Sequence, residues 1–523
     1  MGFRITTNMM MNTYRFNLMN NTNKLSDARD KVLTGRNFNS YAEDPASAAQ
    51  AFRLRREWWQ TNNQMNNTDT AYNKFHTGWV NLAGIIDKLD NVNTKVASIR
   101  GNSGTAGESR TALAQVLRES SESLIQSMNS KLGEQFIFAG NDGLKAPFTW
   151  NADHTVLYYR GVNVNAGGVK APLYEPAGWD KLEEMRAGAI KDDKWTSEMQ
   201  EWYDYYTHAT DKKPVEADNP EPGWLKPGDP DSIIRDDAAD VTDLNEKEQA
   251  WLDYYNHKLE EPPVADYPGW VQTTTDGKID PKGVDEYGRP LNMPDKSGDP
   301  LEQAWINYFN DQSDLNKLKK MDTEELNIDM GMGLQENDTL NHQGYKLVNG
   351  TAFNTALSGV RFIDYGVDED GDPKNSALLM RELANVFETW GENGQKYLPE
   401  KYRDMSSEDL KALMEEDKAV AKEIEDFHNE SEAKAFRLMD KMKAAQEHLT
   451  EEYVSLDASA SFLKTNKERL STQSVYLNEQ VLDIEQIDLA DAITQFSWDQ
   501  YCYNAALKVG NQLLSQSLID YMN

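Results

Sequence analysis

A ladder of apolar residues at a spacing of seven constrains the fold of this chain more than any other feature of its sequence. Its members are Met442, Leu449, Leu456, Leu463, Leu470, Leu477 and Ile484. The companion row is polar, at Glu452, Ser459, Asn466, Gln473 and Gln480. A seven-residue apolar repeat is typical of a helix that packs along another helix, as in a coiled coil. The ladder therefore predicts one long helix with a single packing seam.

A second row, with steps alternating between three and four residues, runs through residues 51–96. Its fourteen members are Ala51, Leu54, Trp58, Thr61, Met65, Thr68, Tyr72, Phe75, Trp79, Leu82, Ile86, Leu89, Asn93 and Val96, and all except Thr61, Thr68 and Asn93 are apolar or aromatic. Asp44 before Pro45 predicts the start of this helix, because Asp caps free N–H groups and a first-turn proline lacks one. After a Gly/Ser-rich break at 101–109, a further helix is expected at about 109–132, with one face formed by Leu113, Leu117, Leu124 and Met128.

Both ends of the chain are nearly free of acidic residues, although the formal net charge is −33. No Asp or Glu precedes Asp27, and from Gln500 onward there is only Asp520. Burying an unpaired charge costs far more than burying an amide that finds a hydrogen bond, so uncharged outer faces suit burial among neighbouring subunits. We therefore interpret both ends as assembly segments. Their predicted interface residues are Met11, Tyr14, Leu18, Leu25, Val32, Leu489, Ile493, Phe496, Tyr503, Leu507, Leu514 and Tyr521.

The middle of the chain has a different pattern, in which apolar and polar residues alternate over short stretches. FIFAG at 136–140, APFTW at 146–150 and TVLYYRG at 155–161 predict short strands, and YKLVNGTAF and GVRFIDYG near 345–366 predict more. Between these groups an acidic, aromatic motif repeats. EWYDYYTHATDKKPVEADNPEPGW at 201–224 aligns with AWLDYYNHKLEEPPVADYPGW at 250–270, and a degenerate copy begins at AWINYFN, 304–310.

The aromatic residues of this repeat have two interpretations. Clustered Trp and Tyr could form a platform that binds sugars, and nearby carboxylates could act as a glycosidase pair. Alternatively, each short repeat uses its aromatic residues as its own small core. The second interpretation is favoured, because short repeats require such a core. The recurrence of His208 at His257 suits repeated architecture better than a metal site.

Composition and motif searches exclude several classes of function. Strong acidity argues against nucleic acid and anionic membranes as partners. The single Cys502 fits neither a disulfide framework nor a cysteine-based metal site. The sequence has no run of 18 apolar residues, so it predicts no membrane-spanning helix. The first thirty residues lack the apolar core of a secretory signal peptide. DEDGD at 368–372 resembles a calcium loop, but Ala377 stands where a bidentate Glu is needed. We expect no catalytic residue, no cofactor and no metal.

Several motifs resemble the flagellin superfamily. They are RITTNMM at 4–10, LSDARDKVLTGRNFNSYAEDPASAAQAFRLR at 25–55, FIFAG, LNEQVLDIEQIDLADAITQF at 477–496, and the ending SLIDYM. Within the superfamily, DPASAAQAFRLR and FIFAG are more similar to hook-filament junction proteins than to filament flagellins. The resemblance covers about residues 1–140 and 430–523, with motifs at both ends in the order of the family.

The resemblance implies an α+β fold, with long terminal helices in an elongated coiled-coil-like bundle and an inserted β-rich or mixed outer domain. The expected divisions are assembly helices at 1–43 and 485–523, a long-helix bundle at 44–135 and 376–484, and an outer domain at 136–375 that holds the repeat at about 174–320. The implied partners are other copies in a ring of a tubular polymer, a neighbouring hook-associated protein, flagellin, and the flagellar export apparatus with its chaperone. The implied location is the extracellular flagellum, reached without a cleaved signal peptide. Filament flagellin is the alternative, and a glycan-binding surface protein is a third.

Overall fold

The computed structural model describes residues 7–38, 40, 42–100, 107–174, 182, 186, 196–214, 223–225, 244–331, 335–336, 345–346, 352–389, 402, 405–416 and 418–521. The chain is mostly helical, at 66%, with a few small sheets, and this confirms the expected α+β class. It divides into two compact units. The terminal unit comprises Met1–Asn73, Asn327–Asn354 and Ser459–Asn523, and the middle unit comprises Lys74–Leu326 and Thr355–Ala458.

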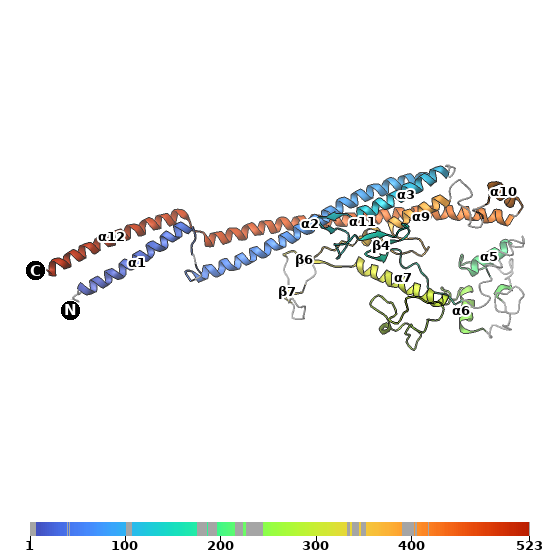
Figure 1. The fold of residues 1–523 in the computed structure, drawn as a ribbon, viewed down its shortest axis with the longest axis horizontal. Helices are drawn as coiled ribbons and strands as arrows, with labels where there is room; N and C mark the ends of the chain where they lie inside the picture. The colour runs from blue at the N-terminus through green and yellow to red at the C-terminus, as the bar shows by residue number, and fades with distance from the viewer. Residues whose placement is uncertain are drawn as a thin grey trace. The chain divides into compact units, whose positions relative to one another are not determined.

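In the terminal unit, the two ends of the chain form a pair of antiparallel helices. α1 (Thr7–Thr34) and α12 (Leu489–Tyr521) lie side by side, with the two termini at the same end (Figure 1). Parts of two longer helices complete this unit, namely the start of α2 (Pro45–Arg100) and the end of α11 (Lys418–Glu485). These parts are also antiparallel, because Ser474 Oγ donates to Asn62 Oδ1 at 2.9 Å while Lys467 pairs with Asp69.

The leucine ladder and the start of α2 confirm two predictions from the sequence. Every ladder residue from Met442 to Leu477 is at most 6% exposed, and Ile484 is half-buried. The Asp44 carboxylate accepts the backbone N–H of Ser47 at 3.1 Å, one turn into a helix that opens with Pro45. A seven-residue period and a capping pair are therefore sufficient to place these helices.

The packing seam predicted for α2 is correct for one row of residues and displaced by one residue for the other. The correct row is buried and contains Thr61, Thr68, Phe75, Leu82, Leu89 and Val96. The second row consists of the residues just before those predicted: Gln64, Ala71, Gly78, Ile85 and Val92. Several of these are small, which lets the helices approach closely: a Cβ on Gly78 would lie 3.3 Å from Leu456 Cδ2. The larger neighbouring residue Trp79 lies at the edge of the seam, where its ring stacks on Tyr453.

In the middle unit, two shorter helices form a second antiparallel pair. α3 (Gly107–Met128) confirms the helix expected near 109–132, and it packs against α9 (Ser376–Thr389). Ser121 Oγ donates to the carbonyl of Ala377 at 2.8 Å, and Arg381 donates to Glu122 at 2.9 Å. α10 (Ser407–Glu416) also belongs to this unit.

The sheets are small and antiparallel. The middle unit holds the hairpin β1 (Lys131–Leu132) with β2 (Gln135–Phe136), and a three-stranded sheet of β3 (Phe148–Trp150), β4 (Leu157–Tyr159) and β5 (Val162–Asn163) in that order. The terminal unit holds β6 (Asn327–Asp329) paired with β9 (Ala352–Asn354), and β7 (Gln335–Glu336) paired with β8 (Tyr345–Lys346).

Two strand predictions are wrong. In FIFAG only Phe136 lies in a strand, Ile137 and Phe138 form a turn, and Ala139 makes an isolated β-bridge with Ser358; residues 137–139 are at most 1% exposed. The Phe138 carbonyl accepts the N–H of Gly359 at 2.8 Å and the hydroxyl of Tyr159 at 3.1 Å, so the segment satisfies its backbone without a ladder. GVRFIDYG begins as a short helix, α8 (Gly359–Ile363). These apolar runs are short and buried on all sides, and such runs do not distinguish strand from helix.

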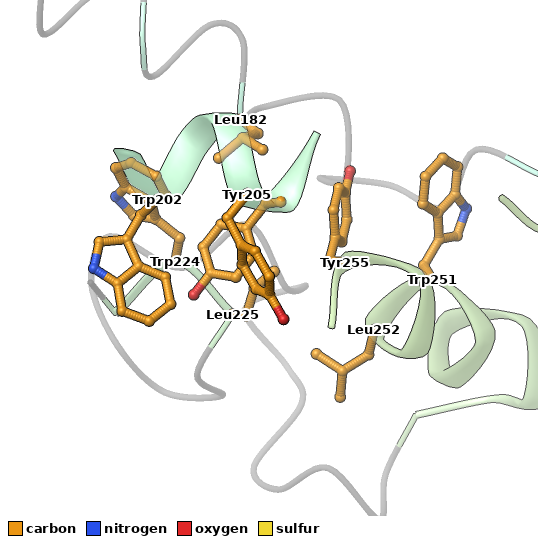
Figure 2. Close-up of a cluster of buried hydrophobic side chains, with 9 residues drawn as sticks. Leu182, Trp202, Tyr205, Trp224, Leu225, Trp251, Leu252 and Tyr255 are labelled. Carbon is orange, nitrogen blue, oxygen red and sulfur yellow. The ribbon is translucent and has the colours of Figure 1, made fainter. Parts of the chain in front are cut away.

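The aromatic repeat forms a core of its own, as the favoured interpretation predicts. α5 (Ser197–Tyr206), the 3₁₀ turn η1 (Gly223–Leu225) and α6 (Glu246–Tyr255) gather their rings into one cluster (Figure 2). Trp202, Trp224 and Trp251 are at most 9% exposed, so these indoles are not available to stack on a sugar. The third copy begins α7 (Pro300–Asp322), after the 3₁₀ turn η3 (Pro281–Gly283), and Trp305 is the centre of a separate cluster.

The two aligned histidines join the repeats through a symmetric stack of four rings. The imidazoles of His208 and His257 lie 3.9 Å apart and parallel, and each stacks at 4.1 Å on a tyrosine of the other repeat. His208 Nε2 lies 2.8 Å from the carbonyl of Tyr254, and His257 Nε2 lies 2.6 Å from that of Tyr205. Both histidines have positive φ directly after a helix, the position at which a helix ends in the left-handed conformation.

Replacing His208 by Ala should therefore loosen both repeats, although it lies in only one. It removes a ring from the middle of the stack and a hydrogen bond to the other repeat, at a cost of about 1–2 kcal/mol. Hydrogen exchange should become faster in α6 as well as in α5. The His208→Ala/His257→Ala pair should cost less than the sum of the single changes, because both act on one stack. Additive effects would contradict the shared stack, and exposed Lys212→Ala is the control.

Candidate assembly interface

The predicted row on α1 is the face that packs against α12. Met11, Tyr14, Leu18, Leu25 and Val32 are all half-buried, and Ala28 in the same row is 6% exposed. The Asn- and Thr-rich sequence of α1 has a low intrinsic helix propensity. Burial of this face against a second helix compensates for that, since most helix stability in proteins comes from such packing.

The α12 face that meets α1 consists of smaller residues than the sequence indicated. Phe496 and Tyr503 are half-buried, and Ala492, Asp499 and Gly510 are buried beside them. The predicted residues Leu489, Ile493 and Leu507 instead remain between 42% and 52% exposed. The side chains of Leu514 and Tyr521 lie outside the described residues. As in α2, several large apolar residues lie one position along the helix from the small residues that form the contact.

The two helices are in tight contact at Gly510. A Cβ built on this glycine would lie 2.0 Å from the hydroxyl oxygen of Tyr14 and 2.3 Å from its Cζ. No side chain can occupy that space unless the tyrosine moves. Gly510 thus lets the ring of Tyr14 lie directly on the backbone of α12.

Replacing Gly510 by Val should separate α1 from α12 at this point. Overpacking of a tight contact typically costs about 1–3 kcal/mol, and the expected readout is faster hydrogen exchange in both helices. Adding Tyr14→Ala should recover part of the loss, because it removes the ring that clashes. Gly84→Ala is the matched control: that helical glycine has no atom within 4 Å of a built Cβ, so stability should stay level or rise slightly. Equal loss in both glycine variants would contradict the close contact.

We call α1 and α12 together the terminal helix pair. A short antiparallel connection fixes the register of this pair. Arg36 and Gln486 form a β-bridge, with Asn37 N donating to Glu485 O at 2.8 Å and Ile487 N donating to Gly35 O at 3.1 Å. The Asn37 side chain donates to the carbonyls of both Ile484 and Gln486. Because these bonds tie the end of α1 to the start of α12, the two helices leave the connection in a defined alignment.

The outward faces of the terminal helix pair carry large apolar side chains. Those that are at least 42% exposed include Met9, Met10, Phe16, Met19, Leu489, Ile493, Trp498, Tyr501, Leu507 and Val509. Few charges interrupt them, since from residue 7 to residue 23 the only charged side chain is Arg15. Extended apolar surface of this kind marks a site of protein association.

Among the described residues, one cluster has the geometry of a metal site, at Asp368, Asp370 and Asp372. The ammonium of Lys441 on α11 lies between the three carboxylates, at 2.6, 2.7 and 2.7 Å, and Arg437 donates to Asp372 at 2.8 Å. Burial alone would raise the pKa of Asp372, but the hydrogen bonds from Arg437 and Lys441 outweigh it and lower that pKa below its ordinary value. The cluster is therefore neutralised by side chains of the protein itself.

None of the described helices has the length and hydropathy needed to cross a membrane.

The two ends of the chain thus form charge-poor paired helices with apolar outer faces. Residues 5–142 match the bacterial flagellin N-terminal helical region, and residues 439–522 match the bacterial flagellin C-terminal helical region. No curated protein and no solved structure matches the chain. Both ends of the chain are thus similar to the terminal helical regions of flagellins, and the flagellins as a family polymerise into the extracellular flagellum.

Proposed function

We propose that this chain is a hook-associated adaptor, of the kind called hook-associated protein 3, that joins the flagellar hook to the filament. The observation that carries the proposal is the terminal helix pair, whose exposed apolar faces need neighbouring subunits to cover them. The flagellin terminal regions support a structural subunit of the flagellum. DPASAAQAFRLR and FIFAG favour a junction protein over a filament flagellin.

In this proposal copies of the chain polymerise as a ring, through the terminal helices at 1–43 and 485–523. Leu489, Ile493 and Leu507 meet neighbouring copies, whereas the row from Met11 to Val32 holds α1 on α12 within each copy. The long-helix bundle at 44–135 and 376–484 surrounds these helices, and the outer domain at 136–375 faces the medium. A hook-associated protein lies on one side, flagellin lies on the other, and the export apparatus with its chaperone delivers the subunit.

Filament flagellin is the alternative, and the position of the protein along the flagellum separates the two. Antibody labelling of intact flagella should give one band where hook meets filament, and a deletion strain should shed its filaments but keep its hooks. Labelling along the whole filament would overturn the adaptor in favour of a flagellin. Absence from the flagellum would overturn both.

A further inference from the structure

The start of α2 carries a basic and aromatic face in a chain that is otherwise strongly acidic. The stretch FRLRREWW at 52–59 has three arginines against one glutamate, while the whole chain has 87 acidic and 54 basic residues. Phe52 and Trp59 are 59% and 62% exposed. Residues 52, 55, 56 and 59 recur at helical spacing, so they share one face of α2.

This face forms one wall of a cleft in the terminal unit. Phe52, Arg55, Arg56 and Trp59 line it from α2, and Arg36, Phe38 and Glu485 line it from the connection that aligns the terminal helix pair. Arg55 forms an ion pair with Glu485. Within the part of the chain that the structure describes, the guanidinium groups of Arg36, Arg53 and Arg56 form no ion pair. The cleft is therefore concave, aromatic and in net excess of positive charge.

The chemistry of the cleft indicates the chemistry of its partner. Exposed Trp and Arg side chains in a recess are the residue types that contribute most to protein interfaces. Unpaired guanidinium groups bind carboxylates in a bidentate manner, which adds both attraction and direction. A partner that complements the cleft is thus a protein surface rich in Asp and Glu.

We propose that this basic cleft, formed by Arg36, Phe52, Arg56 and Trp59, binds an acidic surface of a second copy of the chain. This inference rests on the proposed function, because it names a contact between neighbouring subunits of the polymer. Two observations favour a second copy as the occupant. The chain carries a net charge of −33 and so presents abundant carboxylates, and the cleft adjoins the connection from which the terminal helix pair extends. The contact also offsets repulsion between acidic copies at the point where they meet.

The first test reverses the charge of the cleft and measures polymerisation of the full chain. Arg36→Glu/Arg56→Glu should raise the critical concentration for polymerisation at least about tenfold, with unchanged circular dichroism and melting of the monomer. The matched control is Lys278→Glu/Lys296→Glu, which changes the net charge equally at exposed positions of the middle unit. The control should polymerise almost as the native chain does. Added salt should weaken native assembly more than assembly of the arginine variant, because it screens the cleft contact.

The second test identifies the occupant directly. A photo-crosslinking amino acid in place of Trp59 should, in the polymer, attach to an Asp- and Glu-rich peptide of another copy, and the dilute monomer should give no such product. The cleft contact would be overturned if the arginine variant polymerised with the critical concentration and salt response of the native chain. It would also be overturned if Trp59 crosslinked only within one copy. Either result would leave the adaptor function standing. Failure of the native chain to polymerise, alone or on hooks, would overturn the function together with the contact.

Discussion

Replacing Ile85 by Asp is expected to unfold the middle unit under conditions in which the native chain is stable. The Ile85 side chain is 1% exposed and belongs to the inner row of the α2 seam. The change removes a buried aliphatic group and places a carboxylate at a position that is closed to water. The two losses together amount to about 4–6 kcal/mol, a large fraction of the stability of an ordinary domain. Denaturant unfolding followed by circular dichroism and tryptophan fluorescence measures the effect.

Ile86→Asp provides the control, because it makes the same chemical change at the adjacent position. Ile86 is only half-buried, so its carboxylate can reach water at the rim of the seam. We expect a loss of no more than about 2 kcal/mol there. If Ile86→Asp were as damaging as Ile85→Asp, the seam would include the row that the sequence favoured.

The comparison of these two isoleucines shows how far sequence periodicity determines the helical part of the fold. The seven-residue spacing from Met442 to Leu477 placed α11 and its buried face correctly. In α2 and α12 the apolar spacing identified one of the two buried rows correctly. For the other row it selected bulky apolar residues that lie beside the seam. Where helices approach closely, the contact is made by small residues such as Gly78 and Gly510. Size complementarity between helices is a tertiary property, and hydrophobicity along one helix does not reveal it.

The candidate site was predicted to a similar degree. The charge-poor ends coincide with α1 and α12, and the row from Met11 to Val32 is half-buried on α1; its role in assembly stays a prediction. The division between inward residues and outward residues such as Leu489 and Leu507 could not be predicted, because it depends on which face the partner helix covers. The basic cleft was not predicted from the sequence, although the basic stretch FRLRREWW stands out near the N-terminus of this acidic chain. Its concavity arises from segments more than 400 residues apart, at Arg55 and Glu485.

The acidic loop at 368–372 illustrates a partner that no local pattern indicates. The sequence argues against a calcium loop there, because the twelfth position is Ala377. The structure adds that Lys441, about seventy residues later, occupies the centre of the three carboxylates. Asp372 is 3% exposed and Asp368 is 22% exposed, so part of this network is shielded from water. The ion pairs attach the loop to α11 within the middle unit.

Replacing Lys441 by Met should destabilise the middle unit by about 2–4 kcal/mol at neutral pH. The variant keeps most of the side-chain volume but leaves three carboxylates close together with Arg437 alone to balance them. Breaking a buried pair by removing one partner typically costs about 3–5 kcal/mol, and the half-exposed Asp370 reduces that figure. The matched control is Lys443→Met, two residues along α11, where the side chain is 75% exposed and its ammonium lies 3.9 Å from Glu447. That control should change stability by less than about 0.5 kcal/mol.

The dependence of this loss on pH tests whether charge is its cause. In the native chain, burial tends to raise the pKa of Asp368, but the hydrogen bond from Lys441 outweighs it and lowers that pKa, as for Asp372. A lowered folded pKa contributes stability above the ordinary value of about 3.8, and that contribution disappears as the pH falls through the folded pKa. Without the ammonium, repulsion and burial raise the carboxylate pKa values, so the folded variant binds protons more readily than its unfolded chain does. Its stability should therefore increase as the pH is lowered from 7 towards 5, while that of the native chain changes little from these groups. The difference between the two proteins should narrow over that interval, whereas a difference independent of pH would mean that lost packing of the lysine stem, and not its charge, holds the loop on α11.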